Sequence, residues 1–472
     1  MARPGLPLGS VAPAATASSR DQLVLAGGAV LGGTATLFLL MLALGHVDDY
    51  PAALMLGGVA AFLLYWRWWR SQTGPAGLVP IVFGIAYVVV YGIGMLTFVV
   101  DRQPLGVSVS EPVRAMYGLG LLSFLAGAAL FSRLPGRSGR SARVLDEDRA
   151  LRQVAFSAGV VGGVLLAYNF SKTGVPLLSG DINAARFSTE QAGLSKFNGV
   201  FYGVLEFSLL SMLVLRSRAR RATPGVKDPA ARLLIAGVVG LLLASGSRSF
   251  IVIVLLAFGL YVVQVRKPKL SRVLVLVGFA LLLATSADSA RNSSSALTGS
   301  AIDQNVASGY GTGAKGSILS SLQIGPRVFT IAAQQVPDSV PYQRGRFALR
   351  DGALILRTHE TPGDIWVTNE ILDRPLNIGY PPTIVGGFYI DGGRAGILLG
   401  MLLCAFITVR LTRDWTTSPV VVVAGSYWSA YLMISLYSYV SLKTAVVVFM
   451  ALCLLAKGVA RSAASTEAAG GG

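Results

Sequence analysis

The chain has 472 residues, a formal net charge of +17 and only 13% charged residues. Soluble domains carry about 25% charged residues, so this composition disfavours a soluble protein. The mean hydropathy of +0.61 comes from apolar blocks of roughly twenty residues, the length that crosses about 30 Å of hydrocarbon. The basic residues lie in short runs between these blocks, which argues against nucleic-acid binding. Composition therefore predicts an all-α polytopic membrane protein.

The apolar blocks predict about twelve transmembrane helices. In chain order they cover residues 22–45, 51–66, 76–100, 113–131, 151–170, 197–215, 232–246, 249–265, 272–287, 381–409, 419–437 and 443–459. Almost no loop separates the seventh from the eighth.

These spans divide the chain into one membrane domain with a large insertion. Residues 21–287 hold the first nine predicted spans, and residues 381–460 hold the last three. Residues 288–380 form the longest hydrophilic segment between them. The ends, 1–20 and 461–472, are expected to be disordered cytoplasmic tails.

Lys and Arg alternate between the loops along the whole chain. Residues 133–152 contain six Arg, and residues 216–232 contain six basic residues. The opposite short loops contain few, among them Arg248 and Lys443. Because basic loops are retained in the cytoplasm, this alternation predicts that both termini are cytoplasmic and that residues 288–380 are extracytoplasmic.

The large loop is predicted to contain short helices. It carries eight basic and eight acidic residues, so its charges balance. Apolar residues at helical spacing predict an amphipathic helix over 315–335, and further helices are expected near 346–357 and 363–373. A lid or substrate platform is one interpretation, and a passive cap over the helix bundle is the other.

Arg248 is the clearest candidate for a functional charge. It is expected at the N-terminal end of the eighth helix, between Ser247 and Ser249. Free backbone N–H groups, two hydroxyls and a guanidinium would form an anion site there, since Arg can donate two hydrogen bonds to a phosphate. An Arg that merely marks the membrane interface is the alternative.

Two other arginines lie in the predicted outer loops. With Arg248, Arg186 and Arg291 could bind a diphosphate. Each could equally form a structural ion pair, Arg186 with Glu190 and Arg291 with Asp288.

A glycine-rich break interrupts the apolar stretch 381–409. Such a break often lines a cavity or allows close helix packing, so Tyr389, Asp391 and Arg394 are candidate cavity residues. Asp391 and Arg394 are three residues apart and could instead pair with each other.

The loop also holds candidate bases. His359 could accept a proton near neutral pH, and Glu360, Asp364 and Glu370 compete for the same role. A solvated loop histidine is the alternative. No metal cluster, nucleotide-binding loop or dinucleotide fingerprint is present in the sequence.

Several short segments carry a resemblance to a known family. Gly246-Ser247-Arg248 lies at a short outer turn, and Gly174-Val175-Pro176-Leu177-Leu178 is followed by Asp181 and Arg186. Pro381-Pro382-Thr383 leads into Gly386-Gly387-Phe388-Tyr389 and Gly393-Arg394-Ala395-Gly396. With the long loop before the last three spans, these segments resemble the O-antigen polymerase (Wzy-type) family of oligosaccharide repeat unit polymerases. Gly387 and Gly392 depart from the family pattern, where an acidic and a bulky residue are expected.

The resemblance implies a GT-C-like inverting glycosyltransferase in the bacterial cytoplasmic membrane, active on its outer side. It would polymerise polyprenyl diphosphate-linked oligosaccharides, as donor and acceptor, into a cell-surface polysaccharide without a cofactor. Arg186, Arg248 and Arg291 would bind the departing diphosphate, and His359 or an acidic neighbour would deprotonate the acceptor hydroxyl. A flippase and a chain-length regulator are candidate partners.

Two other functions share this architecture. An O-antigen-ligase-like transferase would use the same donor with a different acceptor. A lipid-linked glycan transporter or flippase would often show an internal repeat across two halves. No repeat is visible in the sequence, because the long loop divides the spans unequally.

Overall fold

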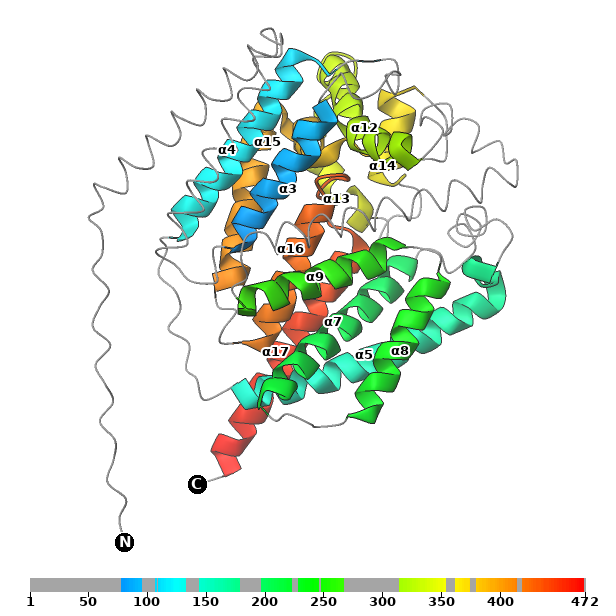
Figure 1. The fold of residues 1–472 in the computed structure, drawn as a ribbon, viewed down its shortest axis with the longest axis vertical. Helices are drawn as coiled ribbons and strands as arrows, with labels where there is room; N and C mark the ends of the chain where they lie inside the picture. Colours follow the sequence, from blue (N-terminus) through cyan, green and yellow to red (C-terminus); the bar gives the residue numbers. More distant parts are fainter. Residues whose placement is uncertain are drawn as a thin grey trace, which may run out of the picture. The chain divides into compact units, whose positions relative to one another are not determined.

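A computed structural model of the chain describes residues 78–95, 107, 109–132, 144–178, 197–222, 228–245, 248–266, 314–353, 361–373, 379–413 and 418–470. All regular structure in these ranges is helical (Figure 1). The described helices belong to one unit, Thr73–Gly472. The predicted spans 22–45, 51–66 and 272–287 lie outside the described residues.

The other nine predicted spans are helices. They are α3 (Leu78–Met95), α4 (Glu111–Ser132), α5 (Val144–Thr173), α7 (Asn198–Ala222), α8 (Pro229–Ala244), α9 (Arg248–Arg266), α15 (Thr383–Arg413), α16 (Pro419–Ile434) and α17 (Thr444–Gly470). Five of them, α4, α5, α7, α15 and α17, are long and apolar enough to cross a membrane. The other four are shorter apolar helices. The described part of the chain is therefore a helical, membrane-type protein.

Helices α4 and α15 lie side by side and run in the same direction (Figure 1). A Cβ added at Gly120 would lie 3.2 Å from Val385, and one at Gly127 would lie 2.9 Å from Ala405. These glycines let the two helices approach closely, as small residues do in membrane helix pairs. The hydroxyl of Tyr117 on α4 also lies 2.9 Å from that of Thr383, at the start of α15.

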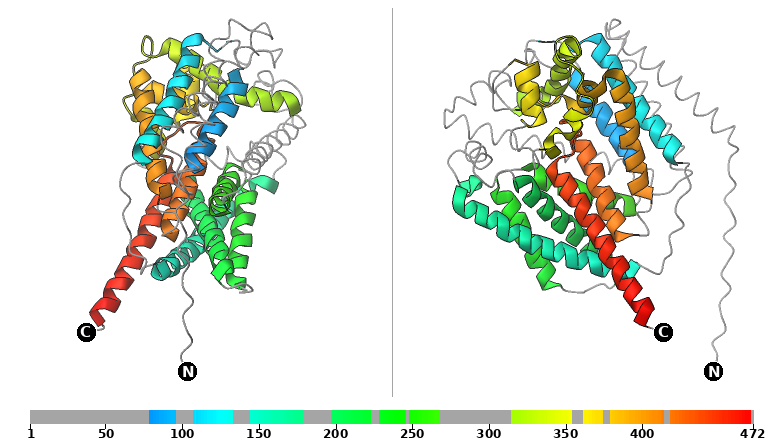
Figure 2. Two further views of the ribbon diagram at one scale, coloured as in Figure 1. Left: turned by 60° about the vertical axis from the view of Figure 1, so that its left-hand side comes forward. Right: turned by 180° about the vertical axis from the view of Figure 1, so that it is seen from behind.

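A second group of helices contains α5, α7, α8, α9, α16 and α17 (Figure 2). Gly203 of α7 closely approaches Ala445 of α17, and Phe207 packs on Phe449 at a ring distance of 5.5 Å, so these two helices run in parallel. Helix α5 runs the opposite way, since its Gly159 faces Ser208 of α7 whereas its Gly162 faces Val204.

Polar contacts join several helix termini at one end of this group. Arg152 of α5 pairs with Asp228, which caps α8, and Arg218 near the end of α7 pairs with Asp148 at 3.3 Å. We call this end, which carries several arginines, the basic end. Helices α4, α7, α15 and α17 all begin at the opposite end (Figure 1). The alternation of basic and non-basic loops predicts this shared direction.

At that opposite end, three further helices pack on the bundle, and we call them the cap. They are α12 (Ala314–Gln335), α13 (Arg346–Ala353) and α14 (Gly363–Trp366), which continues as a π-helix over Val367–Ile371. The amphipathic helix predicted over 315–335 is confirmed, and it packs on α3 and α15 with Val328 and Phe329 fully buried. The helices expected near 346–357 and 363–373 are also present within the described residues.

Helix α15 is broken at Gly392 and Gly393, as the glycine-rich segment predicts. Gly393 has a φ of +63°, and its Cα lies so close to Tyr342 that an added Cβ would sit 2.7 Å from the hydroxyl. The break leaves the carbonyls of Ile390 and Asp391 without their helical donors. Backbone N–H groups of Gln343 and Arg344 donate to these carbonyls at 2.9 and 2.8 Å. The kink therefore binds the cap to the membrane helix.

Helix α17 continues to Gly470, past residue 459, where the last predicted span ends. Its final turns, from Arg461 onward, are rich in Ala, the residue with the highest helix propensity. The predicted disordered tail 461–472 is therefore corrected to a helical extension as far as Gly470.

The two glycines at the break offer a matched pair of substitutions. We expect Gly393→Ala to destabilise the protein by about 1–3 kcal/mol, because its positive φ and the contact with Tyr342 both oppose a Cβ. Gly392→Ala should be nearly neutral, because no atom lies within 4 Å of the added Cβ. Thermal unfolding of the purified protein in detergent measures the difference, and equal melting temperatures for the two variants would contradict this account.

Candidate functional site

The loop 435–443, between α16 and α17, lies directly under the cap. The N–H of Leu442 donates to the carbonyl of Ala348 on α13 at 2.8 Å. Gly352, one turn later, lies so close that an added Cβ would sit 2.5 Å from the Leu442 carbonyl oxygen. The Tyr431 hydroxyl shapes the loop further, since it donates to the Ser441 carbonyl at 2.7 Å and accepts from the Ser441 N–H at 3.0 Å.

Asp351 of α13 joins the cap to this loop. Its Oδ2 accepts hydrogen bonds from the hydroxyls of Tyr439 and Ser441, each at 2.7 Å. Its Oδ1 accepts the N–H of Gly363 at 2.9 Å, at the start of α14. Burial raises the pKa of Tyr439 well above its ordinary value, so this hydroxyl stays protonated and donates. Asp351 is thus a buried carboxylate whose two oxygens are both bound by donors.

Asp364 lies in the first turn of α14, beside Asp351, and has a different environment. Its Oδ1 accepts the adjacent N–H of Ile365 at 3.0 Å, and the backbone N–H of Asp364 itself also interacts with the carboxyl group. Gly379 lies against it, with room for no side chain, since an added Cβ would sit 2.2 Å from Oδ2. Burial raises the pKa of Asp364, Lys443 acts to lower it, and Asp351 adds to the rise. A carboxyl with a raised pKa is suited to exchange protons near neutral pH.

Lys443 supplies the positive charge in this region. Its Nζ lies 5.4 Å from the centroid of the Tyr439 ring. Burial acts to lower the pKa of Lys443, but Tyr431, Asp351, Asp364 and Glu206 together raise it above its ordinary value. Lys443 is therefore protonated. We call Asp351, Asp364, Tyr439, Ser441 and Lys443 the polar site.

A buried carboxyl group continues the polar site into the bundle. Glu206 on α7 is only 1% exposed, and its Oε2 accepts the hydroxyl of Tyr427 on α16 at 2.5 Å. Tyr427 stacks on Phe449 of α17 with ring centroids 3.6 Å apart. Polar groups at membrane depth are costly and are commonly functional.

The structure describes two of the four predicted bases, Asp364 and Glu370, and Glu370 is exposed. Asp364 lies in the polar site, whereas His359 and Glu360 lie outside the described residues. No sequence pattern distinguished Asp364 from the other candidates. The burial of this carboxyl group and the effect of Lys443 on it supply the reason to prefer it.

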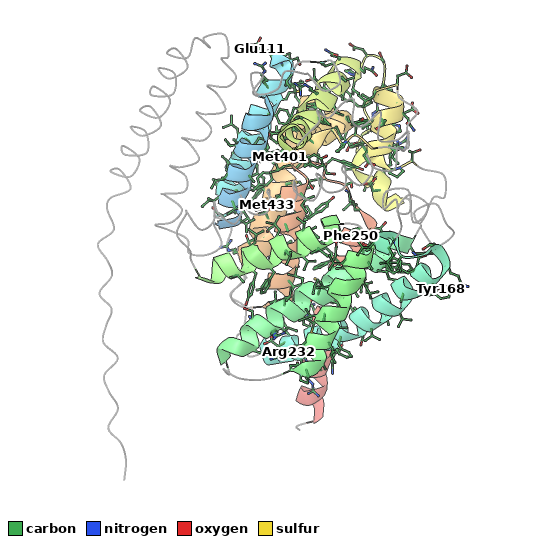
Figure 3. All side chains as sticks on the ribbon, turned by 45° about the vertical axis from the view of Figure 1, so that its right-hand side comes forward. Glu111, Tyr168, Arg232, Phe250, Met401 and Met433 are labelled. Carbon is green, nitrogen blue, oxygen red and sulfur yellow. The ribbon has the colours of Figure 1, made fainter. Side chains whose placement is uncertain are left out.

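The predicted diphosphate ligands are described only in part. Arg186, Arg291 and Ser247 lie outside the described residues. Arg248 is the first residue of α9, as predicted, but the structure describes only its backbone and that of Ser249. Phe250, on the same turn and labelled in Figure 3, stacks on Tyr202 of α7 with ring centroids 3.8 Å apart. This turn therefore lies beside the end of α7 that contacts the start of α17, next to Lys443.

The candidate cavity residues at the kink have separate roles. Tyr389 is buried, and its hydroxyl donates to the Val336 carbonyl at 3.0 Å. Asp391 accepts three backbone N–H groups at the start of α13, from Gly345, Phe347 and Ala348, at 2.9–3.1 Å. Asp391 is thus a helix cap, and the alternative ion pair with Arg394 is absent from the described contacts.

Arginines gather around the same kink. Arg344 and Arg346, at the start of α13, and Arg394, after the break in α15, are exposed. Arg350 packs its guanidinium over the Trp366 ring of α14, 4.9 Å from the centroid. We call these four residues the basic rim. Four arginines outnumber the single carboxylate of Asp391, so the rim is a net positive surface beside the polar site.

Sequence reasoning missed three of the central residues. Lys443 was counted only as a loop charge, although a Lys on the side opposite the basic loops was itself a signal. Glu206 could have been found as an acidic residue inside the predicted span 197–215. Nothing in the sequence singled out Asp351, whose role depends on contacts with residues far along the chain.

The cap of α13 can be tested at Asp391. We expect Asp391→Ala to destabilise the folded protein by about 1–3 kcal/mol, because three backbone donors would lose their acceptor. Asp391→Asn should recover part of the loss, since its side-chain oxygen still accepts. Chemical denaturation measures the order of the three proteins, and an alanine variant as stable as the wild type would refute the capping role.

Comparisons of the chain with protein-family models, with curated protein sequences and with solved structures gave no match. The function of the polar site has to be inferred from the chemistry of its own residues.

Proposed function

We propose that the protein is a membrane glycosyltransferase that polymerises polyprenyl diphosphate-linked oligosaccharide repeat units into a cell-surface polysaccharide. The single observation that carries this proposal is the position of Asp364. This carboxyl group lies in the cap at the start of α14, next to the residue that Asp351 binds, and its pKa is raised by burial while Lys443 acts to lower it. A group of this kind suits removal of a proton from a sugar hydroxyl.

The proposed reaction follows from these groups. Asp364 takes the proton of an acceptor hydroxyl, whose oxygen attacks the anomeric carbon of the donor sugar from the side opposite the leaving group. The bond from that carbon to the diphosphate oxygen breaks, and the polyprenyl diphosphate leaves with the electron pair. The products are an elongated glycan with inverted anomeric configuration and the free lipid diphosphate.

Positive charge near the site supports a diphosphate as leaving group. Arg248 at the start of α9 and the exposed arginines of the basic rim lie at the same end of the bundle as Lys443. Cations that face a developing negative charge lower the barrier to its departure. Arg186 and Arg291 remain candidates for the same role.

The proposed membrane arrangement has about twelve spans, a GT-C-like plan, and the cap on the outer side of a bacterial cytoplasmic membrane. The distribution of basic residues supports this orientation. The described helices support it as well, because the arginine-bearing termini of α5, α7 and α8 meet at the basic end, opposite the cap.

Asp364→Asn is the direct test. It removes the proposed base while preserving the shape of the side chain, so glycan elongation should fall about 10²–10⁴-fold. Purified protein is incubated with a polyprenyl diphosphate oligosaccharide, and longer chains are measured by gel electrophoresis. Glu370→Gln, on the exposed face of the same cap segment, is the matched control and should elongate normally. Normal elongation by the Asp364→Asn variant would rule out this carboxyl group as the base.

Arg248→Ala tests the cationic side of the proposal. It should abolish formation of long polymer without lowering the protein level, because the leaving diphosphate would lose a donor at the helix N-terminus. Arg232→Ala, at an exposed position near the start of α8, serves as the control. Persistence of long polymer in cells carrying Arg248→Ala would contradict a role for Arg248 in diphosphate binding.

A further inference from the structure

Lys443 occupies a position that is unfavourable for a cation. It directly precedes α17, and its carbonyl accepts the N–H of Val447 at 3.1 Å, so it lies at the helix N-terminus. The helix dipole places partial positive charge there, which disfavours a lysine. Lys443 also lies at the end of the bundle opposite the arginine-bearing termini. The helix dipole thus opposes a cation here, and nearby acidic groups would compensate for it.

Contacts through Tyr439 place this lysine near the carboxyl groups of the cap. The Nζ of Lys443 lies 5.4 Å from the centroid of the Tyr439 ring, and the Tyr439 hydroxyl donates to Asp351 at 2.7 Å. The same hydroxyl lies against Gly363, the residue before Asp364, since a Cβ added there would sit 2.7 Å from it.

Five acidic and hydroxyl groups act on the charge of Lys443. They are Glu206 of α7, Asp351 of α13, Asp364 of α14, Tyr431 of α16 and Tyr439 of its own loop. The carboxyl groups come from three different helices, two of the cap and one of the bundle. Lys443 therefore interacts electrostatically with both the cap and the helix bundle.

The hydrogen bonds distinguish the partners of Lys443. Asp351 is bound by Tyr439, Ser441 and Gly363, and Glu206 accepts the hydroxyl of Tyr427. Among the described contacts, Asp364 accepts local backbone N–H groups, from Ile365 and from its own residue, and no side-chain donor. Its ionised form consequently depends more on the lysine than the other two carboxyl groups do.

We propose that Lys443 is a positioning residue that keeps Asp364 in its ionised, proton-accepting form. The inference rests on the proposed function, in which Asp364 is the base. Lys443 itself touches no reacting atom. It acts through Asp364, and hydrogen bonds from Ser441 and Leu442 attach its loop to α13.

The first test is the dependence of elongation on pH. In Lys443→Met, loss of the cation should shift the acid limb of the pH–rate profile to higher pH by about one unit, because Asp364 then binds its proton more tightly. Lys443→Arg should restore the wild-type limb. Lys457→Met, farther along the same helix, should leave the profile unchanged. An unshifted acid limb in Lys443→Met would overturn the proposal, even if this variant elongated glycan more slowly.

The second test needs no activity and separates failure of this inference from failure of the proposed function. A raised folded-state pKa of Asp364 makes the free energy of unfolding fall as the pH rises above its ordinary value, because the folded protein holds a proton that the unfolded chain has lost. Lys443→Met should extend this fall to higher pH, because loss of the cation raises the folded-state pKa of Asp364 further.

The double variant Asp364→Asn/Lys443→Met supplies the control for the stability test. Compared with Asp364→Asn alone, it should show no additional dependence of melting temperature on pH. If Lys443→Met adds the same pH dependence of the melting temperature with Asp364 present as with Asp364→Asn, the coupling between Lys443 and Asp364 is refuted. If the coupling is found but wild-type protein elongates no glycan, the electrostatic inference stands and the enzymatic proposal fails.

Discussion

The arrangement of the described structure depends on the break in α15. A helix in a membrane must satisfy its own backbone groups, so an interruption is tolerated only where other protein groups replace the lost hydrogen bonds. Here the segment around Gln343 and Arg344 supplies the donors, and the carboxylate of Asp391 accepts the first N–H groups of α13. The break in α15 thus determines the direction of α13 in the cap. That helix carries Asp351, which in turn orients α14 and the loop before α17.

This sequence of contacts explains why the polar site lies where it does. Asp351 and Asp364 are on short helices that have little stability of their own. Their positions come from tertiary contacts with α15 and with the loop 435–443. A chemically useful carboxyl group can therefore be held on a short, otherwise weak element.

Much of the fold follows from the sequence, and much less of the site does. Apolar blocks located nine of the described helices, because burial in hydrocarbon imposes a minimum length that is visible in one dimension. The glycines at 392 and 393 correctly predicted a break, since only glycine readily adopts the φ of Gly393. Lys443, Asp351 and Glu206 were not foreseen, because their importance comes from neighbours that are distant in sequence. The end of α17 was placed too early because a polar, alanine-rich segment can be read as a tail or as a helix.

The double hydrogen bond between Tyr431 and Ser441 has a consequence for how the site works. A hydroxyl that both donates to and accepts from one residue closes the loop into a fixed shape before any ligand arrives. Little conformational entropy would then be lost in this loop when a substrate binds, and few dipoles would have to reorient during reaction. Such preorganisation favours a substrate that matches an existing geometry over one that must induce it.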